Sequence, residues 1–144
     1  MTLVVDASVA VRWLFDIDGA AQADALLQSG EPLIAPDLVF SEITNAAWKM
    51  TALAALPGET AAQAVLRSGD FIQEIVASRE LKDPALAIAI ELRHLAYDCF
   101  YLALAEQRDC QIVTADERLL ARCVGTSFAR RIKPLVNARS GRRR

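Results

Sequence analysis

Short apolar runs that end beside acidic residues constrain the fold of this chain more than any other feature. Leu3–Val5 and Gln111–Thr114 are too short to be buried helices, and Asp6 and Asp116 follow them closely. Leu33–Ala35 is a third run of this kind. Such runs predict buried strands, and the longer segments between them show helical periodicity. The sequence therefore predicts an α/β fold, a three-layer sandwich in which helices flank a short central parallel sheet.

The apolar spacing also places the helices along the chain. Ser8 is the predicted N-cap of the first one, and Pro57-Gly58 is a stop signal for the third. Helices are expected at 9–15, 18–27, 37–56, 59–77, 83–95, 98–107 and 117–123, and a last, weak strand is expected at 132–136.

Length and composition predict a single domain without a membrane span. The chain has 144 residues, 53% of them hydrophobic, and a mean hydropathy of +0.24. No apolar run approaches the roughly 18 residues that a bilayer requires. Asp6 interrupts the start of the chain before any signal-peptide pattern develops. We expect a soluble, cytoplasmic protein, and its three cysteines are expected to be buried thiols.

Charge is divided unevenly along the sequence. The net charge is −2, from 16 basic and 18 acidic residues, but no acidic residue lies beyond Arg130. We expect the domain to occupy residues 1–136, with a basic, disordered tail at 137–144. That tail is either a tether for a polyanion or an aid to solubility. The basic residues of this end are Arg130, Arg131, Lys133, Arg139, Arg142, Arg143 and Arg144.

Four carboxylates are the candidates for chemistry. Asp6 and Asp116 follow strands, so both are expected at the carboxyl edge of the sheet, where ligands of parallel sheets bind. Asp98 at a helix start and Glu42 inside a helix can reach the same edge. Two like charges about 4 Å apart repel by on the order of 4 kcal/mol at an effective dielectric near 20. Gathered acids therefore predict a bound cation, and oxygen ligands alone favour Mg²⁺ or Mn²⁺. The alternative is that each aspartate after a strand only caps the next helix.

The order and spacing of the motifs around these acids resemble those of PIN-domain ribonucleases, specifically VapC-like toxins of toxin–antitoxin pairs. The resemblance covers about residues 3 to 120. The motifs are Val4-Val5-Asp6-Ala7-Ser8, Glu42-Ile43-Thr44-Asn45, Tyr97-Asp98-Cys99-Phe100-Tyr101-Leu102-Ala103-Leu104-Ala105 and Ile112-Val113-Thr114-Ala115-Asp116.

The resemblance implies an endoribonuclease that hydrolyses RNA with Mg²⁺ or Mn²⁺. It also implies a cognate antitoxin and a homodimer as partners. The implied metal-binding and catalytic residues are Asp6, Glu42, Asp98 and Asp116. The implied supporting or phosphate-contacting residues are Ser8, Asn45 and Thr114.

Two other functions stay open at this point. A phosphotransfer domain would use Asp6 as its phosphorylated residue, although the sequence lacks the second acid or the lysine setting that such domains have. A PIN-like scaffold without activity would only bind a partner. Such a scaffold is expected to have lost part of the acidic set, whereas the set in this sequence is complete.

Some residues have a plainer interpretation. His94 is the only histidine, and no serine or cysteine has a spacing to it that is typical of a catalytic pair. We expect His94 at the surface or at a helix end. Leu53, Leu56, Phe71 and Ile75 lie on apolar helix faces, which serve either core packing or a dimer or partner interface.

Overall fold

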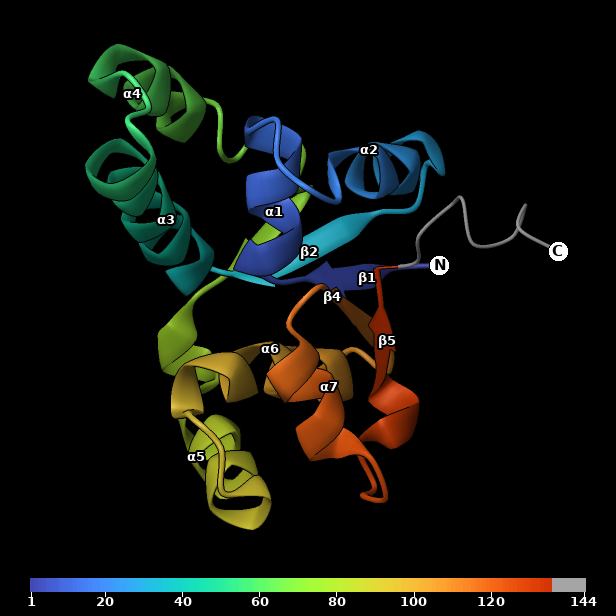
Figure 1. Cartoon of the computed structure of the whole chain (residues 1–144). Coiled ribbons are helices and arrows are strands. Elements are labelled where there is room, and N and C mark those ends of the chain that lie inside the picture. Colours follow the sequence, from blue (N-terminus) through green and yellow to red (C-terminus); the bar gives the residue numbers. More distant parts are fainter. Residues whose placement is uncertain (136–144) are drawn as a thin grey trace, which may run out of the picture.

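Five parallel strands form the centre of the computed structural model, which describes residues 1–135 (Figure 1). Their order is β3-β2-β1-β4-β5. The strands are β1 (Leu3–Val5), β2 (Leu33–Pro36), β3 (Glu74–Val76), β4 (Gln111–Thr114) and β5 (Ile132–Pro134).

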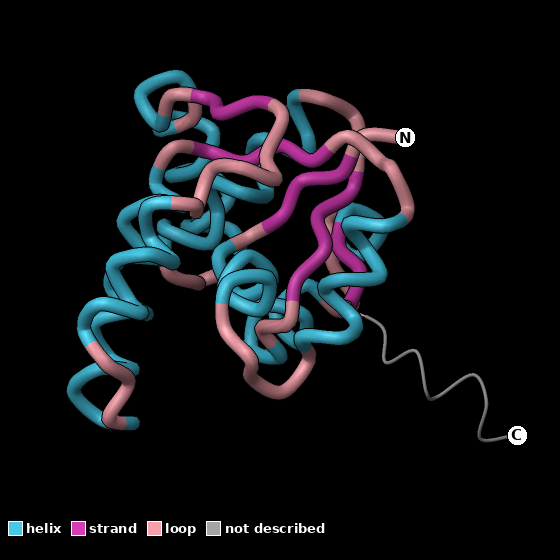
Figure 2. Tube along the Cα trace, turned by 90° about the horizontal axis from the view of Figure 1, so that it is seen from above, coloured by secondary structure: helices cyan, strands magenta, loops and turns pink. Residues whose placement is uncertain are grey.

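Helices cover both faces of this sheet, as Figure 1 shows, with α1, α2 and α4 on one side and α5, α6 and α7 on the other. Seen from above in Figure 2, the strands run side by side between the helices. The α-helices are α1 (Ala7–Leu14), α2 (Ala20–Gln28), α3 (Leu38–Ala54), α4 (Gly58–Leu66), α5 (Lys82–Leu92), α6 (Ala96–Gln107) and α7 (Glu117–Cys123). Short 3₁₀ helices occupy Ser78–Glu80 and Ala129–Arg131.

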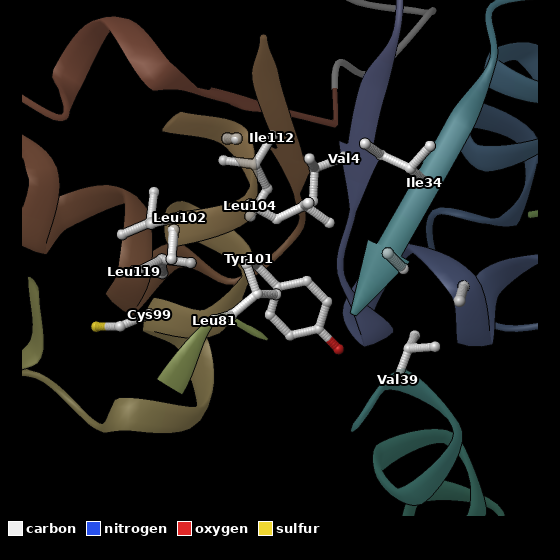
Figure 3. Close-up of a cluster of buried hydrophobic side chains, with 14 of the residues drawn as sticks. Val4, Ile34, Val39, Leu81, Cys99, Tyr101, Leu102, Leu104, Ile112 and Leu119 are labelled. Carbon is white, nitrogen blue, oxygen red and sulfur yellow. The ribbon is translucent and has the colours of Figure 1, made fainter. Parts of the chain in front are cut away.

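Alternation along β1 explains why both faces are covered. Leu3 and Val5 pack with Val9 and Ala23 of α1 and α2, whereas Val4 joins the larger core on the other face. Figure 3 shows that larger core, in which side chains of α6 meet those of β1, β2 and β4. The predicted α/β sandwich with a short parallel sheet is confirmed.

One predicted helix is wrong. The segment 59–77 was expected to be helical throughout, but α4 ends at Leu66 and residues 74–76 form β3 beside β2. Ile72 and Val76 are buried four residues apart, a spacing that also suits a helix. The sequence pattern alone cannot separate the two, because the pairing of Ala35 with Ile75 is a tertiary contact.

Several helix boundaries differ from the expected ones. Asp6, not Ser8, is the N-cap of α1. The helix expected to reach residue 95 ends at Leu92, because Arg93 adopts a left-handed conformation with φ of 53°. The next helix begins at Ala96 rather than at Asp98.

All three cysteines are buried and free, as predicted. Leu56 packs against the core and Phe71 lies edge-on against Trp13, whereas Leu53 is 82% exposed. The basic segment at 137–144 lies outside the described residues. Within residues 1–135, no helix has the length and apolar character of a membrane span.

Candidate active site

The candidate active site lies at the carboxyl edge of β1 and β4, the central pair of strands. Val5 pairs with Val113, so Asp6 and Thr114 emerge at the same level of the sheet. In the sheet, β2 and β3 lie on one side of β1, and β4 and β5 lie on its other side. Such a switch in strand order is where open α/β sheets bind their ligands.

Asp6 is the most buried acid of the site. Its carboxylate accepts hydrogen bonds from Ser8 Oγ at 2.5 Å and from Thr114 Oγ1 at 2.5 Å, and from the backbone amide of Val9 at 3.3 Å. Burial raises the pKa of Asp6 from 3.8 to about 6, in spite of these three donors. The neighbouring charge of Asp98 contributes a smaller part of this increase.

Ser8 and Thr114 tie the loops of the site together. Ser8 Oγ accepts a hydrogen bond from the amide of Ala115 at 2.9 Å, and Thr114 Oγ1 accepts one from the amide of Asp116 at 3.0 Å. Each hydroxyl therefore donates to Asp6 and accepts from the loop between β4 and α7. This network fixes the Asp6 carboxylate against that loop.

Glu42 reaches the site from α3 and is held by Tyr101 of α6. The phenol donates a hydrogen bond of 2.5 Å to Glu42 Oε1, and Figure 3 shows the hydroxyl pointing away from the core, on the side of Val39 in α3. Burial raises the pKa of Glu42, and the charge of Asp98 adds to this increase. The pKa of Tyr101 is raised well above 10 by burial and then by the charges of Glu42, Asp6 and Asp98.

Asp98 lies in the first turn of α6 and pairs with His94. The distance from His94 Nε2 to Asp98 Oδ2 is 2.6 Å, and the exposed fractions of the two side chains are only 9% and 19%. His94 does follow a helix, as expected, but its side chain is not on the surface. The four-residue spacing from Asp98 was the only sequence signal for this pair.

Asp116 has a different environment from the other three acids. Its carboxylate accepts hydrogen bonds from the amides of Arg118 and Leu119 at 2.9 and 3.4 Å and so caps α7. Asp6 also caps its helix, yet it interacts electrostatically with Asp98 as well. The charges of Asp6, Glu42 and Asp98 thus all act on Tyr101. Asp116 is linked to this network through its backbone amide, which donates to Thr114 Oγ1, while its carboxylate caps α7.

Asn45 and Lys49 extend the site along α3. Together with Glu42 and Tyr97 they line a groove of about 570 Å³. Asn45 therefore lines the same groove as Glu42. Tyr97, which was not among the predicted site residues, is 65% exposed and lies next to Asp98 in the sequence.

A hard divalent ion suits these ligands in kind. Within the part of the chain that the structure describes, no three His, Cys, Asp or Glu side chains stand close enough to hold an ion as they are. Mg²⁺, however, is usually held by only one or two carboxylates and completes its shell with waters and substrate phosphate. Asp6 and Asp98, whose charges already repel each other, fit such a shared role.

A family model decides the relationship of this chain to known proteins. The model of the PIN domain matches residues 3–124, which hold all four acids. The chain belongs to the PIN-domain family. This confirms the resemblance that the order of the motifs indicated.

This PIN domain is 27% identical over 121 residues to Ribonuclease VapC3 of Pyrobaculum aerophilum, covering 83% of this chain and 92% of that protein. The crystal structure of PAE2754 from the same organism superimposes with a TM-score of 0.70 at 25% identity, over 94% of this chain and 84% of that one.

Two further solved structures share the fold of this PIN domain. A toxin–antitoxin complex from Klebsiella pneumoniae gives a TM-score of 0.67 at 13% identity, covering 94% of this chain and 98% of that chain. VapBC2 from Rickettsia felis, bound to a DNA fragment from its promoter, gives 0.62 at 10% identity, with 93% and 98% covered.

Proposed function

We propose that this PIN domain is a cytoplasmic endoribonuclease that requires Mg²⁺ or Mn²⁺ and acts as the toxin of a toxin–antitoxin pair. The observation that carries the proposal is that Asp6, Glu42 and Asp98, from three separate elements, all act electrostatically on Tyr101, whose hydroxyl bonds Glu42. A fold accepts such repulsion when the acids serve a cation. The likeness to Ribonuclease VapC3 supports RNA as the substrate.

The residues of the site have different proposed roles. Asp6 and Asp98 would hold the metal ion, and Glu42 and Asp116 would contribute a further ligand oxygen or a hydrogen bond to water. When bound, the ion polarises the scissile phosphate and lowers the pKa of the attacking water. Ser8 and Thr114 keep Asp6 in place, and Tyr101 orients Glu42. Asn45 contacts substrate phosphate from α3.

A cleavage assay tests the proposal. The full chain is incubated with total cellular RNA and Mn²⁺, and new RNA 5′ ends are sequenced; EDTA should abolish them. Asp6→Asn and Asp98→Asn should reduce cleavage at least about 100-fold, because loss of even an outer-shell partner of a metal ligand costs 10–100-fold. Asp70→Asn, at an exposed acid, is the matched control.

Three results would contradict the proposal. Cleavage that persists in both variants removes these residues from the site. The absence of cleavage together with the absence of any carboxylate-dependent response to Mn²⁺ leaves an inactive scaffold. An acid-labile adduct on Asp6 after incubation with acetyl phosphate would instead indicate phosphotransfer.

Partner proteins belong to the same proposal. We infer a cognate antitoxin and a second copy of this chain as partners. Two solved neighbours are toxin–antitoxin proteins, which supports an antitoxin. The exposed apolar side chains of α3 and α4, among them Trp48, Leu53 and Leu66, provide surface for such contacts. Sedimentation of the purified chain, alone and after co-expression with the product of the adjoining gene, tests both partners.

A further inference from the structure

A second groove opens beside the acidic site, between the end of α5 and one face of α7. Its volume is about 900 Å³. Three arginines line it: Arg93 directly after α5, and Arg118 and Arg122 in α7. No acidic side chain of the described residues lines the groove. It is a basic groove in a chain that carries a net charge of −2.

The three guanidinium groups have no acidic partner among the residues that the structure describes. Within residues 1–135, neither Arg93, Arg118 nor Arg122 forms an ion pair, whereas Arg108 and Arg131 pair with Glu74 and Asp109. Arg118 and Arg122 are four residues apart in one helix, so their like charges face each other and repel. An anionic ligand in the groove would remove this repulsion.

The groove is joined to the acidic site by side chains. His94 lines the groove and also bonds Asp98 Oδ2 at 2.6 Å. Arg118 lies two residues after Asp116 and its amide donates to that carboxylate. A ligand lying in the groove therefore ends beside the acids that we assign to metal binding. Such a ligand must carry several negative charges to match the three arginines. It must also be long enough to extend from the groove to the acidic site, where we expect a phosphodiester to bind.

We propose that this arginine groove, defined by Arg93, Arg118 and Arg122, binds the phosphate backbone of single-stranded RNA next to the scissile bond. Guanidinium groups match phosphate oxygens with two parallel hydrogen bonds, and backbone contacts position a nucleic acid without reading its sequence. The inference rests on the proposed ribonuclease function, since it assigns the substrate's path to that site. An acidic protein segment is the competing occupant, but only the RNA also presents its reacting bond to Asp98.

Binding is measured apart from cleavage. In the Asp6→Asn background, fluorescence anisotropy follows a labelled 20-nucleotide RNA of mixed sequence at several salt concentrations. The groove variant Arg93→Gln/Arg118→Gln/Arg122→Gln should weaken binding roughly tenfold or more. The slope of log K against log salt should fall by about 2, because each phosphate contact in a single strand contributes about 0.7. A second RNA of different sequence should lose affinity equally.

The matched control is Arg67→Gln/Arg79→Gln/Lys82→Gln, which removes the same charge from exposed basic residues outside the groove. It should keep the affinity and the salt slope of the parent. Circular dichroism of both variants checks that the fold is kept. Equal affinity of the groove variant and the control overturns the proposal, whether or not the wild type cleaves RNA.

Other outcomes have separate meanings. A groove variant that loses affinity for polyglutamate but not for RNA assigns the groove to an acidic protein segment and overturns the RNA proposal. A wild-type chain that binds RNA through the groove without cutting it contradicts the proposed ribonuclease while the groove assignment stands. The two failures are therefore distinguishable.

Discussion

The phenolic oxygen of Tyr101 lies 2.5 Å from Oε1 of Glu42 and so connects α6 with α3 at the end of the sheet. The ring of Tyr101 is fully buried in the core, yet its hydroxyl reaches a partly exposed carboxylate. One side chain thereby serves both the packing of the fold and the position of a candidate site residue.

Tyr101→Phe should keep the core packing but remove the donor to Glu42. Because a hydrogen bond to a charged group contributes about 1.5–3 kcal/mol, we expect the free energy of unfolding at pH 7.5 to fall by about that amount. Urea denaturation followed by circular dichroism measures it. Tyr97→Phe, at an exposed tyrosine, is the control and should unfold like the wild type. An unchanged midpoint in Tyr101→Phe would show that the bond contributes nothing to stability.

The raised pKa of Asp6 predicts an unusual pH dependence of stability. Its pKa is 3.8 in the unfolded chain and about 6 in the folded one, so between these values the folded state binds the proton more tightly. The metal-free protein should therefore lose stability as the pH rises from about 4 to about 6, by up to roughly 3 kcal/mol. Asp6→Asn should remove this dependence and be more stable than the wild type at pH 7.5.

Denaturation at pH 4, 5, 6 and 7.5 compares the two proteins. Asp24→Asn changes an exposed aspartate of α2 and should follow the wild type at every pH. Parallel curves for wild type and Asp6→Asn would mean that burial does not perturb this carboxyl.

A bound divalent ion should offset the loss of folding stability that the ionised, mutually repelling acids cause. Mn²⁺ at 100 times its dissociation constant stabilises a protein by about 2.7 kcal/mol if it binds only the folded state. We expect Mn²⁺ to raise the Tm of the wild type at pH 7.5, and to do so less below about pH 6, where protons compete for Asp6. Asp98→Asn should abolish the increase and Asp70→Asn should preserve it. An increase of equal size in all three proteins would place the ion elsewhere.

The elements that carry the acids could be predicted because their signals are local. Val5 and Asp6 show a buried strand and its polar end within a few residues, and Ile112 to Asp116 repeat the pattern. Because short buried strands form parallel sheets, whose strands all end at the same edge, both acids are expected at that edge. The pattern alone could place Glu42 and Asp98 only on helices within reach of that edge, and the family resemblance implied that they belong to the same set.

The contacts between distant residues could not be predicted in the same way. β3 was assigned to a helix because its identity depends on pairing with β2. The bond from Tyr101 to Glu42 crosses 59 positions of the sequence. The arginine groove combines Arg93 with two residues of α7, and no local pattern relates those positions. The sequence marks charges, whereas only the fold shows which of them remain unpaired.

Ser8 offers the sharpest test of how the site is held together. Its hydroxyl donates to Asp6 Oδ1 at 2.5 Å and accepts from the amide of Ala115 at 2.9 Å. Ser8→Ala keeps α1 helical, since alanine is a good helix former, but leaves Asp6 with one donor fewer. Because such outer-shell partners are worth 10–100-fold, we expect both cleavage and Mn²⁺ affinity to fall by about that factor.

The matched control for Ser8 is Ser29→Ala, which removes a hydroxyl bonded to Leu26 at the exposed end of α2. It should cleave RNA like the wild type. Ser8→Thr retains the hydroxyl and should restore most of the lost Mn²⁺ affinity, measured by calorimetry in each variant. If Ser8→Ala binds Mn²⁺ as tightly as the wild type does, the hydroxyl of Ser8 does not position Asp6 for the metal. The position of the Asp6 carboxylate would then be set by packing alone.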